Sequence, residues 1–246
     1  MLTPRFILLF AMIASFSNGP AASAKSDAKE TVVLLHGMGR TRLSMQKLGE
    51  RLAAEGFQII NLGYPSTRLS VVECVGHIRD ALDQNEVSEA LPVHFVTHSL
   101  GGIVLRAFLN EHSVPNLGRV VMLSPPNQGS ELADRFMAGP LRSVYRLVTG
   151  PSGQELGTRS HSTPNRLGPV TFPLGVITGD RSTNPLFSSA FPGPNDGKVS
   201  VERAKVAGMT DFLVVPRSHS FIMRSSRVVV ETIHFLRHGR FSHTAA

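Results

Sequence analysis

The chain has 246 residues, of which 41% are hydrophobic and 17% are charged. This length and composition suit one globular domain with a sizeable core and argue against a disordered, collagen-like or coiled-coil chain. The formal net charge is +7, but the basic residues are scattered and no basic-aromatic motif accompanies them, which argues against nucleic-acid binding. The positive charge favours solubility and is compatible with peripheral contact with an anionic membrane surface.

Residues 1–24 have the pattern of a secretory signal peptide. Arg5 precedes an apolar run from Phe6 to Phe16, and the small residues from Ala22 to Ala24 form a cleavage signal. The run is shorter than the ~20 residues that a membrane-spanning helix needs. We therefore predict an exported protein, periplasmic or secreted, whose mature domain covers residues 25–246. An uncleaved anchor or a buried N-terminal helix is the alternative.

Short apolar runs alternate with helical patterns along the mature chain. The runs predict strands over residues 31–35, 58–62, 93–96, 119–123, 174–178 and 212–215. Apolar residues at spacings of three and four predict helices over residues 45–52, 71–82, 101–110 and 228–236. This alternation predicts an α/β fold with a mostly parallel central sheet and helices on both faces. Such sheets bind ligands at the carboxyl ends of their strands.

The segment from about residue 129 to residue 173 breaks this alternation. Its first part is amphipathic, with apolar residues at Leu132, Phe136, Leu141, Val144 and Leu147. Its second part, residues 150–169, is rich in Gly, Ser, Pro and Thr. We predict one helix followed by a loop, which together form a short lid-like insertion between two strands. The apolar side chains of this insertion are candidates to hold an acyl chain or to pack on the sheet.

The segment Thr97-His98-Ser99-Leu100-Gly101 follows a predicted strand and opens a predicted helix. A serine on such a tight turn is exposed at the end of the sheet, and its neighbours must be small because other backbone comes close. The segment matches the G-x-S-x-G nucleophile elbow except that Thr97 replaces the first glycine. We predict that Ser99 is a nucleophile; an ordinary turn is the alternative for this segment taken alone.

A second turn, His36-Gly37, follows the first predicted strand about 60 residues before Ser99. A turn at this position brings a backbone N–H group toward the nucleophile, and the residue after the serine supplies another. We assign these oxyanion-stabilising N–H groups to Met38 and Leu100. His36, Gly37 and Gly101 are the expected supporting residues.

With these two motifs the chain resembles the bacterial lipases and esterases of the α/β-hydrolase superfamily. Residues 124–130 (SPPNQGS) resemble the P-x-x-G-S turn of these lipases, and residues 195–199 (NDGKV) resemble the segment that bears their catalytic acid. His219 follows the last predicted strand, as their catalytic histidine does. The resemblance implies the α/β-hydrolase fold and a catalytic triad of Ser99, Asp196 and His219.

The chain order of these three residues is the order found in α/β-hydrolases. An imidazole can accept the proton of Ser99 because its unperturbed pKa lies near 6.5, and a carboxylate holds the imidazole in the required tautomer. Asp180 also follows a predicted strand, so it is the alternative acid. Asp211 begins the last strand, at the opposite end of the sheet, and is poorly placed.

The sequence predicts no metal site and no cofactor. Related lipases often bind calcium through an acidic residue just after the catalytic histidine, but Ser220, Phe221 and Ile222 follow His219 here. No cluster of histidine, cysteine or acidic residues elsewhere has metal-ligand spacing. The single cysteine, Cys74, lies on a helical apolar stripe, which predicts a buried thiol.

These observations predict a serine hydrolase of the lipase and esterase type, which cleaves a small-molecule or lipid ester through an acyl-enzyme on Ser99. A thioesterase, an amidase or an acyltransferase would use the same triad, because fold and triad do not separate these activities. A non-catalytic binding protein of the same fold is the weakest alternative, and Thr97 is its only support.

Overall fold

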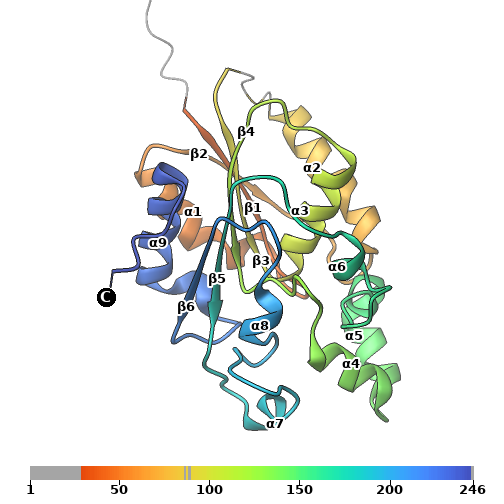
Figure 1. Ribbon diagram of the computed structural model, residues 1–246. Helices are drawn as coiled ribbons and strands as arrows, with labels where there is room; N and C mark the ends of the chain where they lie inside the picture. Colours follow the sequence, from red (N-terminus) through yellow and green to blue (C-terminus); the bar gives the residue numbers. More distant parts are fainter. Residues whose placement is uncertain (1–28, 86, 88–89, 245–246) are drawn as a thin grey trace, which may run out of the picture.

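The computed structural model describes residues 29–85, 87 and 90–244 (Figure 1). The predicted signal peptide, residues 1–24, lies outside these residues. Among the described helices, none combines the length and the apolar character that a membrane crossing requires.

The described residues form a six-stranded sheet in the order β2-β1-β3-β4-β5-β6, and every strand pair is parallel. The strands are β1 (Thr31–Leu35), β2 (Gln58–Leu62), β3 (Val93–His98), β4 (Leu117–Leu123), β5 (Leu174–Gly179) and β6 (Asp211–Val215). The prediction of a mostly parallel α/β sheet is confirmed. The chain adds β2 on one side of β1 and then adds β3 on the other side, so the strand order reverses between β1 and β3. Ligands bind at such a switch point of an α/β sheet.

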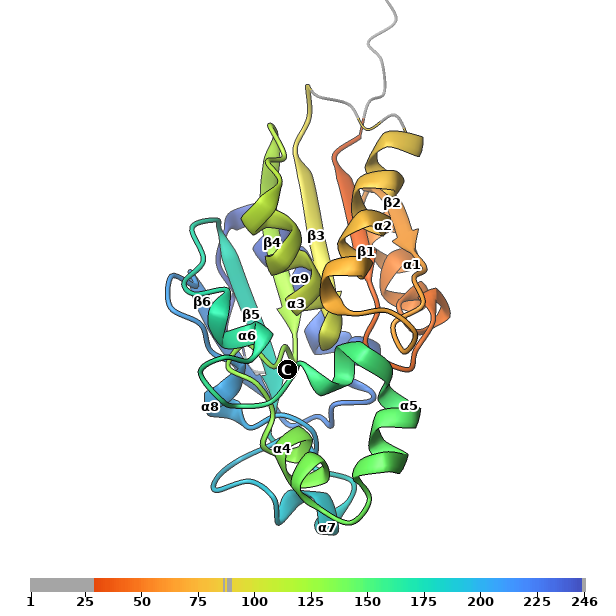
Figure 2. The same ribbon diagram turned by 90° about the vertical axis from the view of Figure 1, so that its right-hand side faces the viewer.

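Helices cover both faces of this sheet (Figures 1 and 2). On one face lie α2 (Val71–Gln84) and α3 (Leu100–Glu111), and on the other lie α1 (Gln46–Ala54) and α9 (Ser226–His238). The start of α2 shows why these boundaries fall where they do. Ser70 and Glu73 cap each other's backbone N–H groups in a capping box, which satisfies donors that a helix start leaves free.

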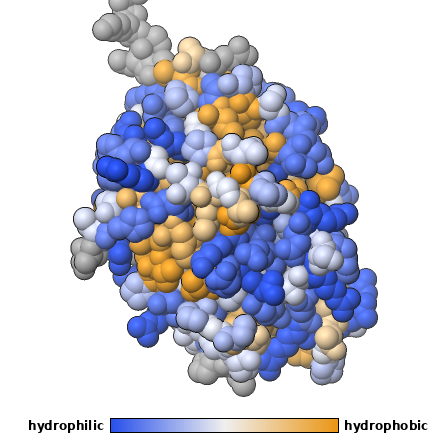
Figure 3. All heavy atoms as spheres, viewed as in Figure 1, coloured by the Kyte–Doolittle hydropathy of each residue, from blue (hydrophilic) through white to orange (hydrophobic). Residues whose placement is uncertain are grey.

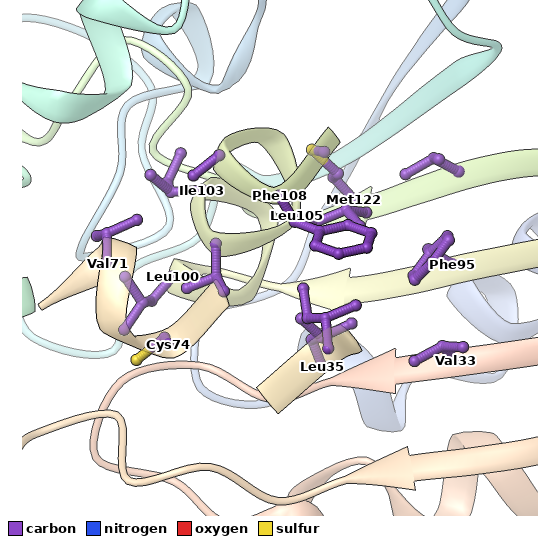
Figure 4. Close-up of a cluster of buried hydrophobic side chains, with 14 of the residues drawn as sticks. Val33, Leu35, Val71, Cys74, Phe95, Leu100, Ile103, Leu105, Phe108 and Met122 are labelled. Carbon is purple, nitrogen blue, oxygen red and sulfur yellow. The ribbon is translucent and has the colours of Figure 1, made fainter. Parts of the chain in front are cut away.

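Two hydrophobic clusters fill the space between the sheet and its two helical layers. Val33 and Leu35 of β1 face α2 and α3 (Figure 4), whereas Val32 and Leu34 face α1 and α9. Because both faces are buried, the strands read as continuous apolar runs in the sequence rather than as alternating patterns. Cys74 lies in the first cluster, where burial raises the pKa of its thiol to about 12, so the prediction of a buried thiol is confirmed.

The insertion between β4 and β5 differs from the prediction of one helix and a loop. It contains three helices: α4 (Glu131–Ala138), α5 (Arg142–Gln154) and α6 (Thr163–Arg166). Gly150 has φ 66°, which bends α5, and Pro151 then opens a further helical stretch because its fixed φ suits a first helical turn. Figures 1 and 2 place α4 and α5 at the carboxyl ends of the strands, near α7 (Pro185–Ser188).

The apolar residues of this insertion do not share one buried face. Leu141, Val144 and Leu147 are exposed, Leu147 by 84%, because α5 turns Tyr145 and Thr149 toward the protein instead. Leu132 and Phe136 of α4 face inward. The prediction that the apolar side chains share one inward face is therefore correct for α4 and wrong for α5.

The connection from β5 to β6 contains only short helices, α7 and α8 (Val201–Ala204). Val214 of β6 therefore stays 36% exposed, and Figure 3 shows apolar surface over this strand. Two 3-10 turns, η1 (Arg42–Ser44) and η2 (Ile222–Arg224), complete the described elements.

Candidate active site

Ser99 lies at the sharp turn between β3 and α3. Its φ of 53° and ψ of −123° are a strained combination for a residue with a side chain. Two backbone hydrogen bonds hold the turn: the N–H of Ser99 donates to the carbonyl of Leu123, and the N–H of Gly102 donates to the carbonyl of Ser99, both at 2.9 Å. This is the strand–turn–helix geometry that presents a serine hydroxyl at the end of a sheet.

Close backbone packing explains why positions 37 and 101, which both lie next to Ser99 in the fold, are glycines. A Cβ atom on Gly101 would lie 2.8 Å from the carbonyl oxygen of Leu35 and 2.9 Å from that of His36. A Cβ atom on Gly37 would lie 2.7 Å from Nδ1 of His98. The turn after β1 and the start of α3 can approach each other this closely only because both positions lack side chains.

Thr97, which departs from the elbow pattern, is accommodated by the second glycine of the Gly101-Gly102 pair. The side chain of Thr97 is fully buried, and its Oγ1 lies 3.3 Å from the point where a Cβ on Gly102 would stand. Within the described chain this hydroxyl has no hydrogen-bond partner. The elbow therefore keeps its shape with threonine at the first position because Gly102 has no side chain that would crowd the Thr97 hydroxyl.

The structure brings the three predicted triad residues together. Nε2 of His219 lies 2.9 Å from Oγ of Ser99, and Nδ1 of His219 lies 2.8 Å from Oδ2 of Asp196. His219 and Asp196 are both buried. An ionised carboxylate only accepts hydrogen bonds, so Nδ1 carries the imidazole proton and Nε2 is free to accept the proton of Ser99. The N–H of His219 also donates to the carbonyl of Asp196 at 3.0 Å, which ties the two loops together.

Asp196 is held as a carboxylate by its surroundings. Its Oδ1 accepts hydrogen bonds from the N–H groups of Lys198 at 3.0 Å and Val199 at 2.9 Å. Burial acts to raise the pKa of Asp196, but the charge and hydrogen bond of His219, the Ser124 hydroxyl and the hydrogen bond from the Val199 N–H outweigh it and lower the pKa. One oxygen thus faces the backbone and the other faces the imidazole.

Asp180, the alternative acid, points elsewhere. It follows β5, its N–H donates to the carbonyl of Val215, and its Oδ1 lies 3.7 Å from Nε of Arg181. In the described chain, the carboxylate bonded to His219 belongs to Asp196 and not to Asp180. The geometry therefore favours Asp196 as the acid.

The N–H groups assigned to oxyanion stabilisation are unengaged. Leu100 is the first residue of α3, so its N–H has no partner within the helix. No hydrogen bond between described residues uses the N–H of Met38, and the side chain of Met38 lines the same cavity as Ser99. Both groups are thus available to a ligand.

His36 supports the turn that carries Met38. Its Nδ1 donates to the carbonyl of Gly37 at 2.9 Å, its Nε2 accepts from the N–H of Tyr64 at 3.4 Å, and its ring stacks on Tyr64 with centroids 4.3 Å apart. Burial lowers the pKa of His36, which keeps the ring neutral. The two contacts fix the tautomer and the position of the turn.

His98 is a site residue that sequence reasoning missed. Its Nε2 donates to the carbonyl of His219 at 2.9 Å, and its ring lies 4.9 Å from the His219 ring. Burial, together with the neighbouring charge of His219, lowers the pKa of His98 well below its ordinary value. A neutral His98 therefore fixes the loop that carries His219. Its place beside Ser99 in the sequence does not reveal this orientation.

A cavity of about 180 Å³ adjoins Ser99 and His219. Its walls are mainly apolar, and Leu132, Ala133 and Phe136 of α4 supply one of them. Phe136 stacks on Tyr145 at 5.3 Å and meets the edge of the Phe187 ring at 5.9 Å, and all three rings line the cavity. Helices of the insertion therefore form the apolar side of the site. Among the described residues, no group of three or more His, Cys, Asp or Glu side chains could hold a metal ion.

Comparisons with known proteins agree with this architecture. Residues 32–231 match the model of the alpha/beta hydrolase family, whereas no curated protein matches the sequence. Mature lipase BlEst2 from Bacillus licheniformis is similar in structure, with a TM-score of 0.65 and 19% identity over 85% of this chain and 91% of the lipase. The metagenomic carboxyl esterase MGS0156 gives a TM-score of 0.62 and 18% identity over 85% of this chain and 71% of the esterase. Lipase B from Aspergillus fumigatus gives a TM-score of 0.62 and 13% identity over 87% of this chain and 54% of the lipase. At these identities the likeness shows a shared fold.

Proposed function

The chain belongs to the alpha/beta hydrolase family, and we propose that it hydrolyses carboxylic esters through a covalent acyl-enzyme on Ser99. The observation that carries this proposal is the unbroken hydrogen-bonded series from Ser99 through His219 to Asp196 beside an apolar cavity. The lipases and esterases among the similar structures support the ester class through the fold that they share with this chain.

In the proposed mechanism, Oγ of Ser99 attacks the carbonyl carbon of the ester while Nε2 of His219 takes the serine proton. The N–H groups of Met38 and Leu100 stabilise the negative charge on the carbonyl oxygen. His219 then gives its proton to the leaving alcohol, and the acyl group stays on Ser99. Water, deprotonated by His219, cleaves this acyl-enzyme and releases the acid. Asp196 stabilises the imidazolium that forms in both halves of the reaction.

The dimensions of the cavity favour a short acyl chain. Its volume of about 180 Å³ is below the ~300–1,000 Å³ of typical small-molecule sites. A water molecule takes about 30 Å³ of liquid, so the cavity holds roughly six groups of that size. The aromatic cluster of Phe136, Tyr145 and Phe187 walls this space. We therefore propose that a short acyl group binds against α4 and that the alcohol part of the substrate extends toward solvent.

We also propose that the chain is exported and acts in the periplasm or outside the cell. The support is the sequence of residues 1–24, in which Arg5, an apolar run and a small-residue cleavage signal follow one another. Contact with an anionic membrane surface is a further proposal, supported by the net charge of +7.

Hydrolysis of nitrophenyl esters of graded acyl length tests the proposed activity. Purified protein should hydrolyse the short esters, and Ser99→Ala should lower kcat by at least about 10⁴-fold because the nucleophile is lost. Ser143→Ala, an exposed serine of α5, is the matched control and should keep full activity. Matched thioester and anilide substrates separate the alternatives. A protein that cleaves only those, or that transfers the acyl group only to an added alcohol, would contradict ester hydrolysis.

A further inference from the structure

A cationic residue lies on the wall of the cavity that contains Ser99 and His219. Lys198 lines this cavity and its side chain also remains exposed to solvent, so it stands at the mouth. Its backbone is fixed on two sides: its N–H donates to Oδ1 of Asp196 at 3.0 Å, and its carbonyl accepts from Oγ of Ser130 at 2.6 Å. The backbone of Lys198 is therefore held in place next to the triad, and its side chain extends from this fixed point.

A second cation, Arg40, is carried by the loop after β1, whose Gly37 packs against the serine: a Cβ atom on Gly37 would lie 3.1 Å from Cβ of Ser99. Arg40 belongs to the turn that carries Met38, and its N–H donates to the carbonyl of Gly37 at 3.2 Å. Partial desolvation of the ammonium group at the cavity wall lowers the pKa of Lys198, and the positive charge of Arg40 lowers it further. Both cations also contribute to the lowered pKa of His98, beside the catalytic histidine. The loops that carry Arg40 and Lys198 thus both border Ser99, because Met38 of the first loop and Lys198 of the second line the same cavity.

Neither cation is neutralised by the part of the chain that the structure describes, where no ion pair includes Lys198 or Arg40. The nearby carboxylate, Asp196, acts to raise the pKa of Lys198 but is engaged by His219 and by two backbone N–H groups. Two like charges held together disfavour each other's charged form. A bound anion relieves this repulsion, and a cationic mouth also attracts anionic molecules toward the site.

We propose that the substrate ester carries an anionic group, a carboxylate or a phosphate, on its alcohol part, and that Lys198 and Arg40 bind this group. The inference rests on the proposed function and names the class of ester. The anion belongs to the alcohol part because the acyl cavity beyond Ser99 is apolar, and an unpaired charge buried there would be costly. Lys198 at the mouth meets the part of the substrate that extends toward solvent.

Two measurements test this proposal independently of each other. The first is the ratio of kcat/KM for two esters with the same short acyl group, one of hydroxybenzoate and one of an uncharged phenol. The ratio should favour the anionic ester, fall about tenfold in Lys198→Gln and recover in Lys198→Arg. It should also shrink with added salt, because exposed charges are screened. Lys205→Gln, which removes a partly exposed lysine paired with Glu202, is the control and should leave the ratio unchanged.

The second measurement is calorimetric binding of hydroxybenzoate, hydroxyphenyl phosphate and phenol to the intact protein, which requires no catalysis. The two anions should bind about tenfold more tightly than phenol, and Lys198→Gln and Arg40→Gln should each reduce this difference. The stronger of the two anions identifies the preferred group. Equal binding of phenol and both anions would overturn the inference, as would a Lys198→Gln variant that lowers the rates on both esters equally. Anion binding without ester hydrolysis would refute the proposed function and leave this site standing.

Discussion

Replacing Asp196 with asparagine should inactivate the protein while leaving its fold intact. Oδ1 of Asp196 accepts two backbone hydrogen bonds, from Lys198 and Val199. Turning an amide NH₂ group toward those two donors would lose both bonds, at roughly 1–3 kcal/mol for each group left unsatisfied. The amide oxygen therefore stays there, and the NH₂ group takes the position 2.8 Å from Nδ1 of His219.

Two donors then face each other unless His219 moves its proton from Nδ1 to Nε2. In that tautomer Nε2 cannot accept the proton of Ser99, although the distance of 2.9 Å between them is unchanged. The same substitution in a trypsin-type triad lowers kcat about 10⁴-fold through the wrong tautomer. We expect a similar loss here, which corresponds to about 5.4 kcal/mol of activation free energy at 1.36 kcal/mol per tenfold.

The assay is steady-state hydrolysis of a short nitrophenyl ester, with the urea unfolding midpoint measured on the same samples. Asp180→Asn is the matched control, because Asp180 also follows a strand at this end of the sheet but faces Arg181. Asp180→Asn should keep at least about half of the activity, because its carboxylate pairs at 3.7 Å with the exposed Arg181 and is not bonded to His219. A crippled Asp180→Asn beside an active Asp196→Asn would show that the acid has been wrongly chosen.

Three further predictions concern packing, pH and acyl length. Gly101→Ala should lower the free energy of unfolding in urea by roughly 1–3 kcal/mol through overpacking, whereas Gly76→Ala, where a Cβ meets nothing within 4 Å, should not; equal effects would refute the packing argument. The pKa values of His36 and His98 are lowered in the folded state, so below about pH 6.5 the unfolded chain binds more protons. The stabilisation is present above that pH and is lost as pH falls toward the lowered values; a urea midpoint that stays constant or rises from pH 7 to pH 5 would contradict this. Phe136→Ala should shift the kcat/KM optimum toward longer acyl esters, whereas the exposed Leu147→Ala should not; an unmoved optimum would mean that this ring does not bound the cavity.

The inner strands of the sheet were predictable because each contains a short apolar run, and burial on both faces makes such runs conspicuous. Boundaries moved by one or two residues: β3 extends through His98, two residues beyond the predicted end, so the elbow begins directly where the strand stops. The insertion was less predictable, because Gly150 and Pro151 are typical of loops and here bend and restart a helix.

The convergence of Ser99, Asp196 and His219 was predictable from motifs. A strand–turn–helix elbow restricts side-chain size around Ser99, as the close contacts of Gly37 and Gly101 show. The groups that position the three residues were not predictable. His98 holds the carbonyl of His219, which lies 121 residues away in the sequence, and only the folded register makes that contact. Lys198 likewise reads as one more basic residue until the fold places it at the mouth of the cavity.

Covalent labelling tests the central claim, that Ser99 is the activated nucleophile, most directly. The protein is incubated with a short-chain alkyl phosphonate carrying a nitrophenyl leaving group, and the intact mass and the peptide map are measured. We predict a single adduct on the peptide containing Ser99, no adduct in folded Ser99→Ala, and labelling slowed by orders of magnitude in Asp196→Asn. Labelling of Ser99→Ala at the wild-type rate, or an adduct on another residue of the native protein, would contradict the assignment.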